Sequence, residues 1–374
     1  MPLPAIFRIT STSRIFGLDV LRAFAILMVM ILHSSTWVSP QFTFFHEFVR
    51  HYDGVAVFFV LSGFLIGGVL IKTLETKGAH RSNLWDFWVR RWIRTVPPYL
   101  LVLPVVMAFE IHNGVPARTY LPYFVFLQNF NWPIPPAFLE SWSLTVEEWF
   151  YLLSAPASFL LAKLLKPRYG VLLAAVLFLV GSTAYRYDYF QHYQPQDWPD
   201  WDAHFRKIVL LRLDSLMYGV LAAWVAYYFP AAWARAKWPL FVVGFVGLSM
   251  IANPVAPNDL TLFTCVWSFS VAGLGVAFML PLMNSWKHAS GALASIVTHI
   301  SLISYSLYLL HATIVNANIA VPVVRMLPLP GPVKSLAGLA ILWGLSLPLA
   351  TLMYKYFEVP VMALRNRLKQ KSPA

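Results

Sequence analysis

The chain has 374 residues, of which 59% are hydrophobic and 12% charged, and its formal net charge is +12. Hydrophobic residues at this frequency, gathered in long runs, exclude an ordinary soluble domain and predict an all-α protein that crosses a membrane many times. We therefore interpret the Lys and Arg residues as marking which loops lie on the cytoplasmic side of a lipid bilayer, and we expect no nucleic-acid partner. A single cysteine excludes an intramolecular disulfide and a cysteine metal cluster, and we expect no metal.

Ten apolar segments are predicted to cross the bilayer. When the N-terminus is placed in the cytoplasm, most Lys and Arg residues gather on the cytoplasmic side, so both termini are predicted to be cytoplasmic. Residues 1–374 form a single membrane domain with a core over 14–360, and residues 361–374 form a basic cytoplasmic tail. The segments are residues 14–37, 54–74, 88–109, 142–165, 169–186, 207–229, 238–252, 260–283, 297–320 and 335–354.

The first segment contains two ionisable side chains, Arg22 and His33. Such residues are costly inside a bilayer and mark a functional site by default. Eleven positions on a helix place both side chains on one face, about 16 Å apart along the axis. We therefore expect a site that runs through the membrane, with a cation at one depth and a titratable base at another. Arg22 also argues against a cleavable signal peptide.

The second segment carries small residues, among them Ser62, Gly63, Gly67 and Gly68. Small residues on a spanning helix allow another helix to pack closely. The alternative is a groove in which a ligand approaches the backbone of Ser62 and Gly63. The sequence leaves both interpretations open.

The third segment begins with three arginines, Arg90, Arg91 and Arg94. The spacing of Arg91 and Arg94 places two guanidinium groups on one helix face. Guanidinium groups bind phosphate through paired hydrogen bonds, so this cluster is a candidate phosphate site. The alternative is the anchoring of a helix end by positive charge on the cytoplasmic side.

Residues 110–141 are predicted to form an outer loop that dips into the bilayer. The stretch 120–130 is apolar but only about half as long as a span requires. Irregular backbone at membrane depth is tolerated where it lines a cavity. The fourth segment follows, with Trp142 near its start and the adjacent Glu147 and Glu148. The topology places these carboxylates at the level of His33, where one of them could orient the imidazole.

The later segments add further polar residues. Residues 185–204 combine aromatic rings with carboxylates, which suits a carbohydrate but is also typical of an aromatic belt at a membrane surface. Arg212 and Asp214 are two positions apart, so each needs a partner on another helix. In the ninth segment Tyr305 and His311 are candidate substrate contacts, although a lone histidine there usually bonds a neighbouring helix. Trp142 and Glu358, at the end of the tenth segment, are the remaining substrate-binding candidates.

The chain resembles the acyltransferase-3 family of integral membrane acyltransferases, which modify bacterial surface sugars. Nearly the whole chain carries the resemblance, with small departures such as Trp149, which stands where a polar residue is common. The resemblance implies a core of ten helices, an acyl-CoA donor, first of all acetyl-CoA, and required roles for Arg22 and His33. The motifs, in chain order, are GLDVLRAFAILMVMILH, GVAVFFVLSGFLIG, FWVRRWIRTVPPY, SWSLTVEEWFYLL, RLDSLMYG, SYSLYLLH and YKYFEVP.

These observations together predict an O-acyltransferase of the bacterial cytoplasmic (inner) membrane. Acyl-CoA would bind at Arg90, Arg91 and Arg94, and its pantetheine arm would pass Ser62, Gly63 and Arg22. His33 would act as general base on a sugar or polysaccharide hydroxyl, and Glu147 or Glu148 would orient it. Direct transfer is preferred over an acyl-histidine intermediate.

Two other classes stay open at this point. A transporter or flippase of a glycan intermediate would also carry intramembrane ionisable residues, although no matched pair of interrupted segments is visible. A non-catalytic scaffold would not require those residues. The acceptor, the length of the acyl group and the oligomeric state, a homo-oligomer included, are left open by the sequence.

Overall fold

The computed structural model describes residues 14–39, 41–42, 44–45, 53–251 and 259–370, and for 365–370 it describes the backbone alone. All regular structure in these ranges is helical, as the composition predicts. The predicted cytoplasmic position of the two chain ends concerns residues 1–13 and 371–374, which lie outside the described residues.

By length and composition, the described part of the chain contains seven helical stretches that could cross a membrane. They make the chain a multi-pass membrane protein. The helices that form them are α1 (Phe16–Ser34), α3 (Gly54–Lys77), α4 (Arg81–His112), α6 (Pro167–His192), α11 (Ser268–Ser285), α12 (Ala292–Leu310) and α14 (Gly331–Met353).

The remaining expected segments are less regular. Helix α5 (Trp142–Leu164) has 23 residues but carries two adjacent carboxylates. The expected helix over 207–229 is wrong in its first half, because residues 207–216 are not helical and α8 (Met217–Tyr228) has only 12 residues. Helix α10 (Lys237–Ser249) has 13 residues. Ten spans therefore stay a prediction.

Shorter helical segments connect or extend these helices. Four are π-helical segments, which are rare in proteins overall but often occur at functional sites. They are η5 (Asp202–Arg206), η7 (Phe263–Trp267), η8 (His311–Ala320) and η9 (Tyr354–Glu358). The others are η2 (Ser35–Trp37), η3 (Ala117–Val125), η4 (Leu139–Ser141), α7 (Trp198–Trp201), α9 (Pro230–Arg235), α13 (Val321–Met326) and α15 (Val359–Gln370).

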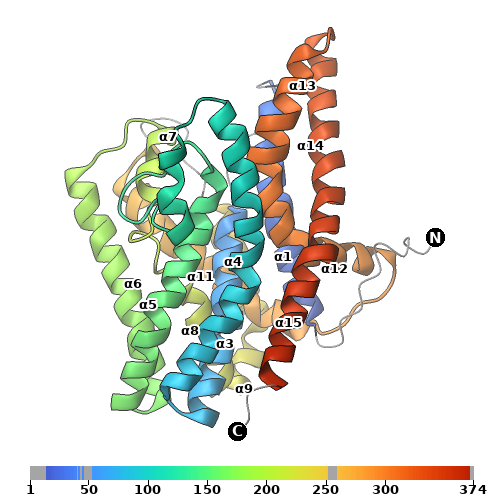
Figure 1. Ribbon diagram of the computed structural model, residues 1–374. Coiled ribbons are helices and arrows are strands. Elements are labelled where there is room, and N and C mark those ends of the chain that lie inside the picture. The colour runs from blue at the N-terminus through green and yellow to red at the C-terminus, as the bar shows by residue number, and fades with distance from the viewer. Residues whose placement is uncertain (1–13, 40, 43, 46–52, 252–258, 371–374) are drawn as a thin grey trace.

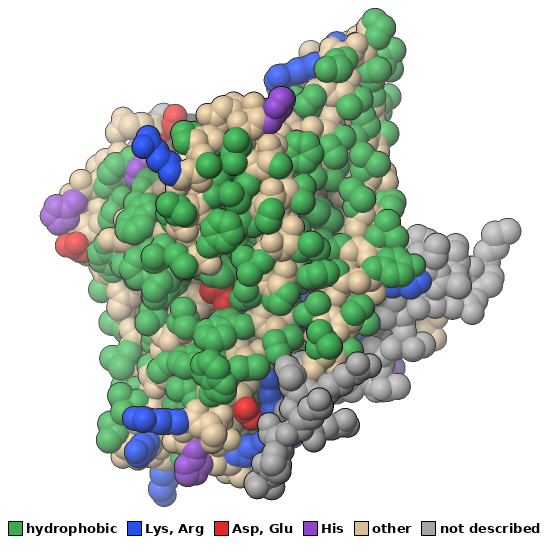
Figure 2. Space-filling view, in the orientation of Figure 1, with side chains coloured by type: hydrophobic (Ala, Val, Ile, Leu, Met, Phe, Trp, Pro, Cys, Tyr) green, Lys and Arg blue, Asp and Glu red, His purple; other side chains and the backbone are tan. Residues whose placement is uncertain are grey.

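The helices form one bundle, with α5 and α6 at one edge and α14 with α15 at the other (Figure 1). The turns between α3 and α4 and between α5 and α6 lie at the same end of the bundle, and we call residues 77–81 and 163–168 the basic end. We call residues 113–141 and 193–207 at the opposite end the loop end. Figure 2 shows a wide hydrophobic band between charged side chains at the two ends, as a bilayer requires.

Helices α3 and α8 pack with their backbones in close approach. A Cβ atom on Gly63 would lie 1.9 Å from the carbonyl oxygen of Leu216, and one on Gly219 would lie 2.0 Å from that of Val60. Glycine is therefore required on both sides of this contact. Of the two interpretations of the small residues in this segment, the structure supports helix packing for Gly63.

Part of the irregular loop end is buried inside the protein, including Gln128 and Asn129. Gln128 donates a hydrogen bond of 2.6 Å to the hydroxyl of Thr145, and Asn129 donates one of 3.2 Å to the carbonyl oxygen of Trp142. The backbone N–H of Val209 bonds the carbonyl oxygen of Asn129 at 3.0 Å. Non-helical backbone at membrane depth is stable only when its polar groups are satisfied in this way.

Candidate functional site

The loop end contains a cavity of about 530 Å³, which we call the histidine cavity. It is built by the ends of α1, α3 and α5 together with η4, η5, α7 and η8. The stretch 185–204, whose first part is the end of α6, reaches it through Trp198, Pro199, Asp202 and Ala203, whereas Trp201 and other aromatic rings of the stretch pack in a separate cluster. Its polar and aromatic lining residues are His33, Ser35, Thr36, Asp53, Glu140, Trp142, Trp198, Asp202, Arg206, Lys207, Tyr308 and Thr313.

His33 enters this cavity from the last turn of α1. Its Nδ1 lies 3.0 Å from the carbonyl oxygen of Val29 and 2.9 Å from Nε2 of His311. Since Nδ1 is turned toward these two groups, Nε2 is the ring nitrogen left to face the cavity. His311 itself is fully buried and does not line either of the cavities described here, so it is not placed to contact a substrate.

Ion-paired side chains line part of the histidine cavity. Arg206 donates hydrogen bonds of 3.1 Å to Asp53 and 2.9 Å to Asp202, and Lys207 also pairs with Asp202. Burial alone would raise the pKa of Asp53, but the charge and hydrogen bonds of Arg206 hold it below the ordinary value. The Arg206 guanidinium lies 5.0 Å from the ring centroid of Trp142. The cavity therefore offers fixed carboxylate acceptors beside an aromatic face.

Glu140 is a carboxylate of this cavity that the sequence analysis missed. It accepts hydrogen bonds from the backbone N–H of Thr313 at 2.8 Å and from the Thr313 hydroxyl at 2.6 Å. Burial raises the pKa of Glu140, and the bonds from Thr313 offset only part of that shift. The signal that could have indicated Glu140 is its position as an acidic residue between a proline-rich stretch and the SWSL motif.

A second cavity, which we call the cationic cavity, lies between α1, α3, α4, α5 and α12. Its volume is about 100 Å³. Lining residues on α3 run from Val55 to Ile66, which is about 16 Å of helix, so the space is narrow and extends along the bundle. Its polar lining residues are Arg22, Ser62, Arg91, Arg94, Thr95, Ser143, Glu147, Tyr151, Ser304, Tyr305 and Tyr308. Three arginines against one glutamate give this lining a net positive charge.

The two cavities meet at Val55 and Tyr308, which line both. The Tyr308 hydroxyl donates a hydrogen bond of 2.9 Å to the backbone carbonyl of Glu140 and lies 2.7 Å from the hydroxyl of Ser143. Glu140 lines the histidine cavity and Ser143 lines the cationic cavity. Tyr308 therefore forms the wall between them.

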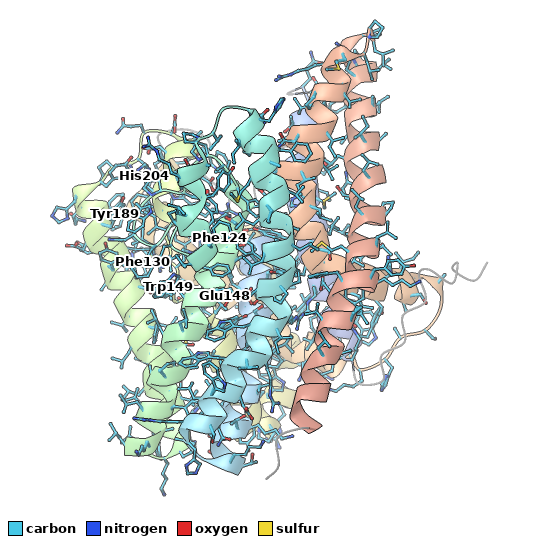
Figure 3. The ribbon with its side chains drawn as sticks, in the orientation of Figure 1. Phe124, Phe130, Glu148, Trp149, Tyr189 and His204 are labelled. Carbon is cyan, nitrogen blue, oxygen red and sulfur yellow. The ribbon has the colours of Figure 1, made fainter. Side chains whose placement is uncertain are left out.

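The glutamate pair lies deeper than the sequence analysis expected. Glu147 lines the cationic cavity with Arg22 and accepts a hydrogen bond from Tyr151, so it is not beside His33. Glu148, labelled in Figure 3, is buried and lines neither cavity, and it accepts a hydrogen bond of 2.6 Å from the Thr95 hydroxyl. The physical reason is depth: α5 begins at Trp142, and five or six residues carry the pair about 8 Å along the helix axis.

Several other expected site residues also take different positions. Arg91 and Arg94 line the cationic cavity, but Arg90 turns away to a separate pocket and lies 3.8 Å from Asp86. Gly63 lies in the α3–α8 contact, while the neighbouring Ser62 faces the cavity. Two candidate substrate contacts, Trp142 and Tyr305, do reach a cavity.

Two further residues serve packing. Glu358 is buried in η9 and accepts a hydrogen bond from Ser306, so it lines neither cavity. Trp149, where the resembling family commonly has a polar residue, packs against Phe130 with ring centroids 4.4 Å apart (Figure 3). The described residues contain no group of three or more His, Cys, Asp or Glu side chains that could hold a metal ion.

Comparison with known proteins gives one family and several relatives. The model of the acyltransferase domain of the acyltransferase-3 family matches residues 15–355. O-acetyltransferase OatA of Staphylococcus aureus (strain NCTC 8325 / PS 47) is 33% identical over 168 residues, which cover 41% of this chain and 26% of OatA. "Putative O-acetyltransferase SACOL0978" of S. aureus (strain COL) is 25% identical over 332 residues, which cover 80% of this chain and 50% of that protein. The matches thus span half or less of these relatives. No solved structure shows a significant match.

Proposed function

Because this chain belongs to the acyltransferase-3 family, we propose that it is a membrane O-acetyltransferase that transfers an acetyl group from acetyl-CoA to a hydroxyl of a sugar or polysaccharide intermediate. The names of its relatives support O-acetyl transfer. The observation that carries the proposal is the meeting of a cationic cavity and a histidine cavity at Val55 and Tyr308. We place the enzyme in the bacterial cytoplasmic membrane, with the basic end in the cytoplasm.

The cationic cavity is the proposed donor site. Arg91 is half-buried, Arg94 is exposed and both line this cavity, so their guanidinium groups can bind the phosphates of acetyl-CoA. The cavity is too narrow for a nucleotide, but its extent along the bundle suits the unbranched pantetheine arm. That arm would pass Ser62 and Arg22 and bring the thioester to Tyr308.

The histidine cavity is the proposed acceptor site. Trp142 and Trp198 offer aromatic faces for a sugar ring, and Asp53 and Glu140 offer oxygen atoms for its hydroxyl groups. Nε2 of His33 takes the proton of the acceptor hydroxyl as its oxygen attacks the thioester carbonyl. The tetrahedral intermediate then expels CoA as thiolate and leaves the acetyl ester on the sugar.

The test is acetyl-CoA binding and turnover by purified protein in detergent. We expect slow thioester cleavage that is lost in His33→Ala. The double variant Arg91→Ala/Arg94→Ala should weaken binding tenfold or more, since each charge-assisted hydrogen bond is worth about 1.5–3 kcal/mol. Arg90→Ala is the matched control and should bind like the wild type, because Arg90 faces another pocket. Absence of binding to both acetyl-CoA and succinyl-CoA would overturn the proposal and favour a transporter or a scaffold.

A further inference from the structure

We propose that His311 is a positioning residue that holds the His33 ring in the tautomer with its proton on Nδ1, which leaves Nε2 unprotonated toward the acceptor. The inference rests on the proposed function for its catalytic meaning, but the tautomer can be measured without any activity. Every contact that carries it is between buried or half-buried groups at the end of α1 and the beginning of η8.

The tautomer of His311 is set by its own backbone. Its Nδ1 lies 3.0 Å from the carbonyl oxygen of Leu307 and 2.9 Å from that of Tyr308. Carbonyl oxygens only accept hydrogen bonds, so this nitrogen must carry the proton. A neutral imidazole has a single N–H. Nε2 of His311 therefore presents a lone pair.

That lone pair determines the tautomer of His33. Nε2 of His311 lies 2.9 Å from Nδ1 of His33, whose other neighbour is the carbonyl oxygen of Val29 at 3.0 Å. Both neighbours accept, so Nδ1 of His33 must be the donor. The proton of the neutral His33 ring is then on Nδ1, and Nε2 is free to accept the proton of a substrate hydroxyl. In water, by contrast, histidine prefers the tautomer with the proton on Nε2.

The reverse arrangement fails on three of the four contacts. If His311 donated from Nε2, its unprotonated Nδ1 would face two carbonyl oxygens, and the unprotonated Nδ1 of His33 would face the carbonyl of Val29. At three contacts, a nitrogen lone pair would then face a carbonyl lone pair in a buried site, where an unsatisfied polar group is most costly.

The position of His311 is fixed by the fold. The ring is fully buried, and η8 begins at this residue. Two residues on, Thr313 is fixed by its hydrogen bonds to Glu140. Since His311 lines neither cavity, it acts on the reaction only through His33.

Kinetics give the first half of the test, with two variants. His311→Leu removes the acceptor, whereas His311→Gln can place an oxygen acceptor near the position of Nε2. We expect His311→Leu to lower kcat tenfold or more, a part of the ~10²–10⁴-fold effect of a general base, with KM for acetyl-CoA nearly unchanged. His311→Gln should recover most of kcat. Equal loss in both variants, or a loss confined to KM, would overturn the positioning role.

Nitrogen NMR gives the second half. In protein with ¹⁵N-labelled histidine, the His33 signals are identified by their absence in His33→Ala. We expect a protonated Nδ1 and an unprotonated Nε2 in the wild type, and a larger share of the Nε2–H tautomer in His311→Leu, in which only the carbonyl of Val29 still accepts a hydrogen bond from Nδ1. An Nε2–H tautomer in the wild type would overturn the inference, whatever the activity. Full transfer activity of His33→Ala would instead overturn the proposed base and leave the measured tautomer as a structural fact.

Discussion

The contact between α3 and α8 gives a sharp prediction, because one segment contains both a packed and an unpacked glycine. A methyl group on Gly63 would lie 1.9 Å from the carbonyl oxygen of Leu216 and 2.8 Å from its carbon. These atoms belong to backbone, so no side-chain rotation relieves the clash and the two helices must separate by more than about 1 Å. Gly68, five residues on, has no atom within 4 Å of such a methyl group.

The expected magnitudes follow from this geometry. Overpacking a tight contact costs about 1–3 kcal/mol and occasionally more. The change from glycine to alanine in a helix returns about 1 kcal/mol or less through helix propensity. Because the clash is with backbone, its cost should lie at the upper end, so Gly63→Ala should lower stability by about 2 kcal/mol after the propensity gain is subtracted. Gly68→Ala should leave stability equal or slightly higher.

The assay is thermal unfolding in detergent of the wild type, Gly63→Ala and Gly68→Ala, with acetyl-CoA binding measured at a temperature at which all three are folded. A shift of about 2–4 °C per kcal/mol is expected for a chain of some 150–250 residues, and a smaller one for a longer chain. Gly63→Ala should melt lower and still bind acetyl-CoA. An unchanged Tm with weakened binding would place Gly63 in a ligand groove and refute the packing argument.

Two further predictions concern buried ion pairs. Arg206→Met should lower stability at neutral pH. The pKa of Asp53 is lowered in the folded state, so the wild type should lose stability as the pH drops below the ordinary value of 3.8. The variant, which lacks Arg206, should lose less stability on acidification. Equal acid dependence of Tm in both proteins would contradict this. Arg186→Leu removes the 2.7 Å pair with Asp214 and should cost about 3–5 kcal/mol, partly restored by adding Asp214→Asn. A double variant no more stable than Arg186→Leu would show that the unpaired charge is not the cause.

Local spacing predicted well those features that a single helix determines. Arg91 and Arg94 are three positions apart and do line one cavity. Arg22 and His33 are eleven apart and reach two spaces at different depths. Arg90, next to this pair, faces elsewhere because adjacent residues on a helix point about 100° apart.

Contacts between distant segments could not be predicted in the same way. Arg206 and Asp53 are 153 positions apart, and Thr313 and Glu140 are 173 apart. No periodicity in one sequence reports such pairs, so Asp53 and Glu140 of the histidine cavity were missed. The same limit explains the misplacement of Glu147, whose depth depends on where α5 begins relative to the end of α1.

The irregular stretch 208–216 was predicted in part and missed in part. The sequence indicated that Asp214 needs a partner on another helix, and the structure supplies Arg186 of α6. The sequence did not indicate that the chain would leave the helix there. Arg212 lies 4.1 Å from the ring centroid of Phe269, a contact that turns allow and that hydropathy does not report. Burial of these groups overrides helix propensity over nine residues.

The most direct test of the account is vectorial transfer in proteoliposomes. Labelled acetyl-CoA is supplied on the side of the basic end, an oligosaccharide acceptor is enclosed with the loop end, and labelled ester is measured for the wild type and His33→Ala. The account predicts ester on the acceptor side with the wild type, none with His33→Ala, and none when acetyl-CoA is supplied only at the loop end. Transfer that needs donor and acceptor on the same side, or that persists in His33→Ala, would contradict it.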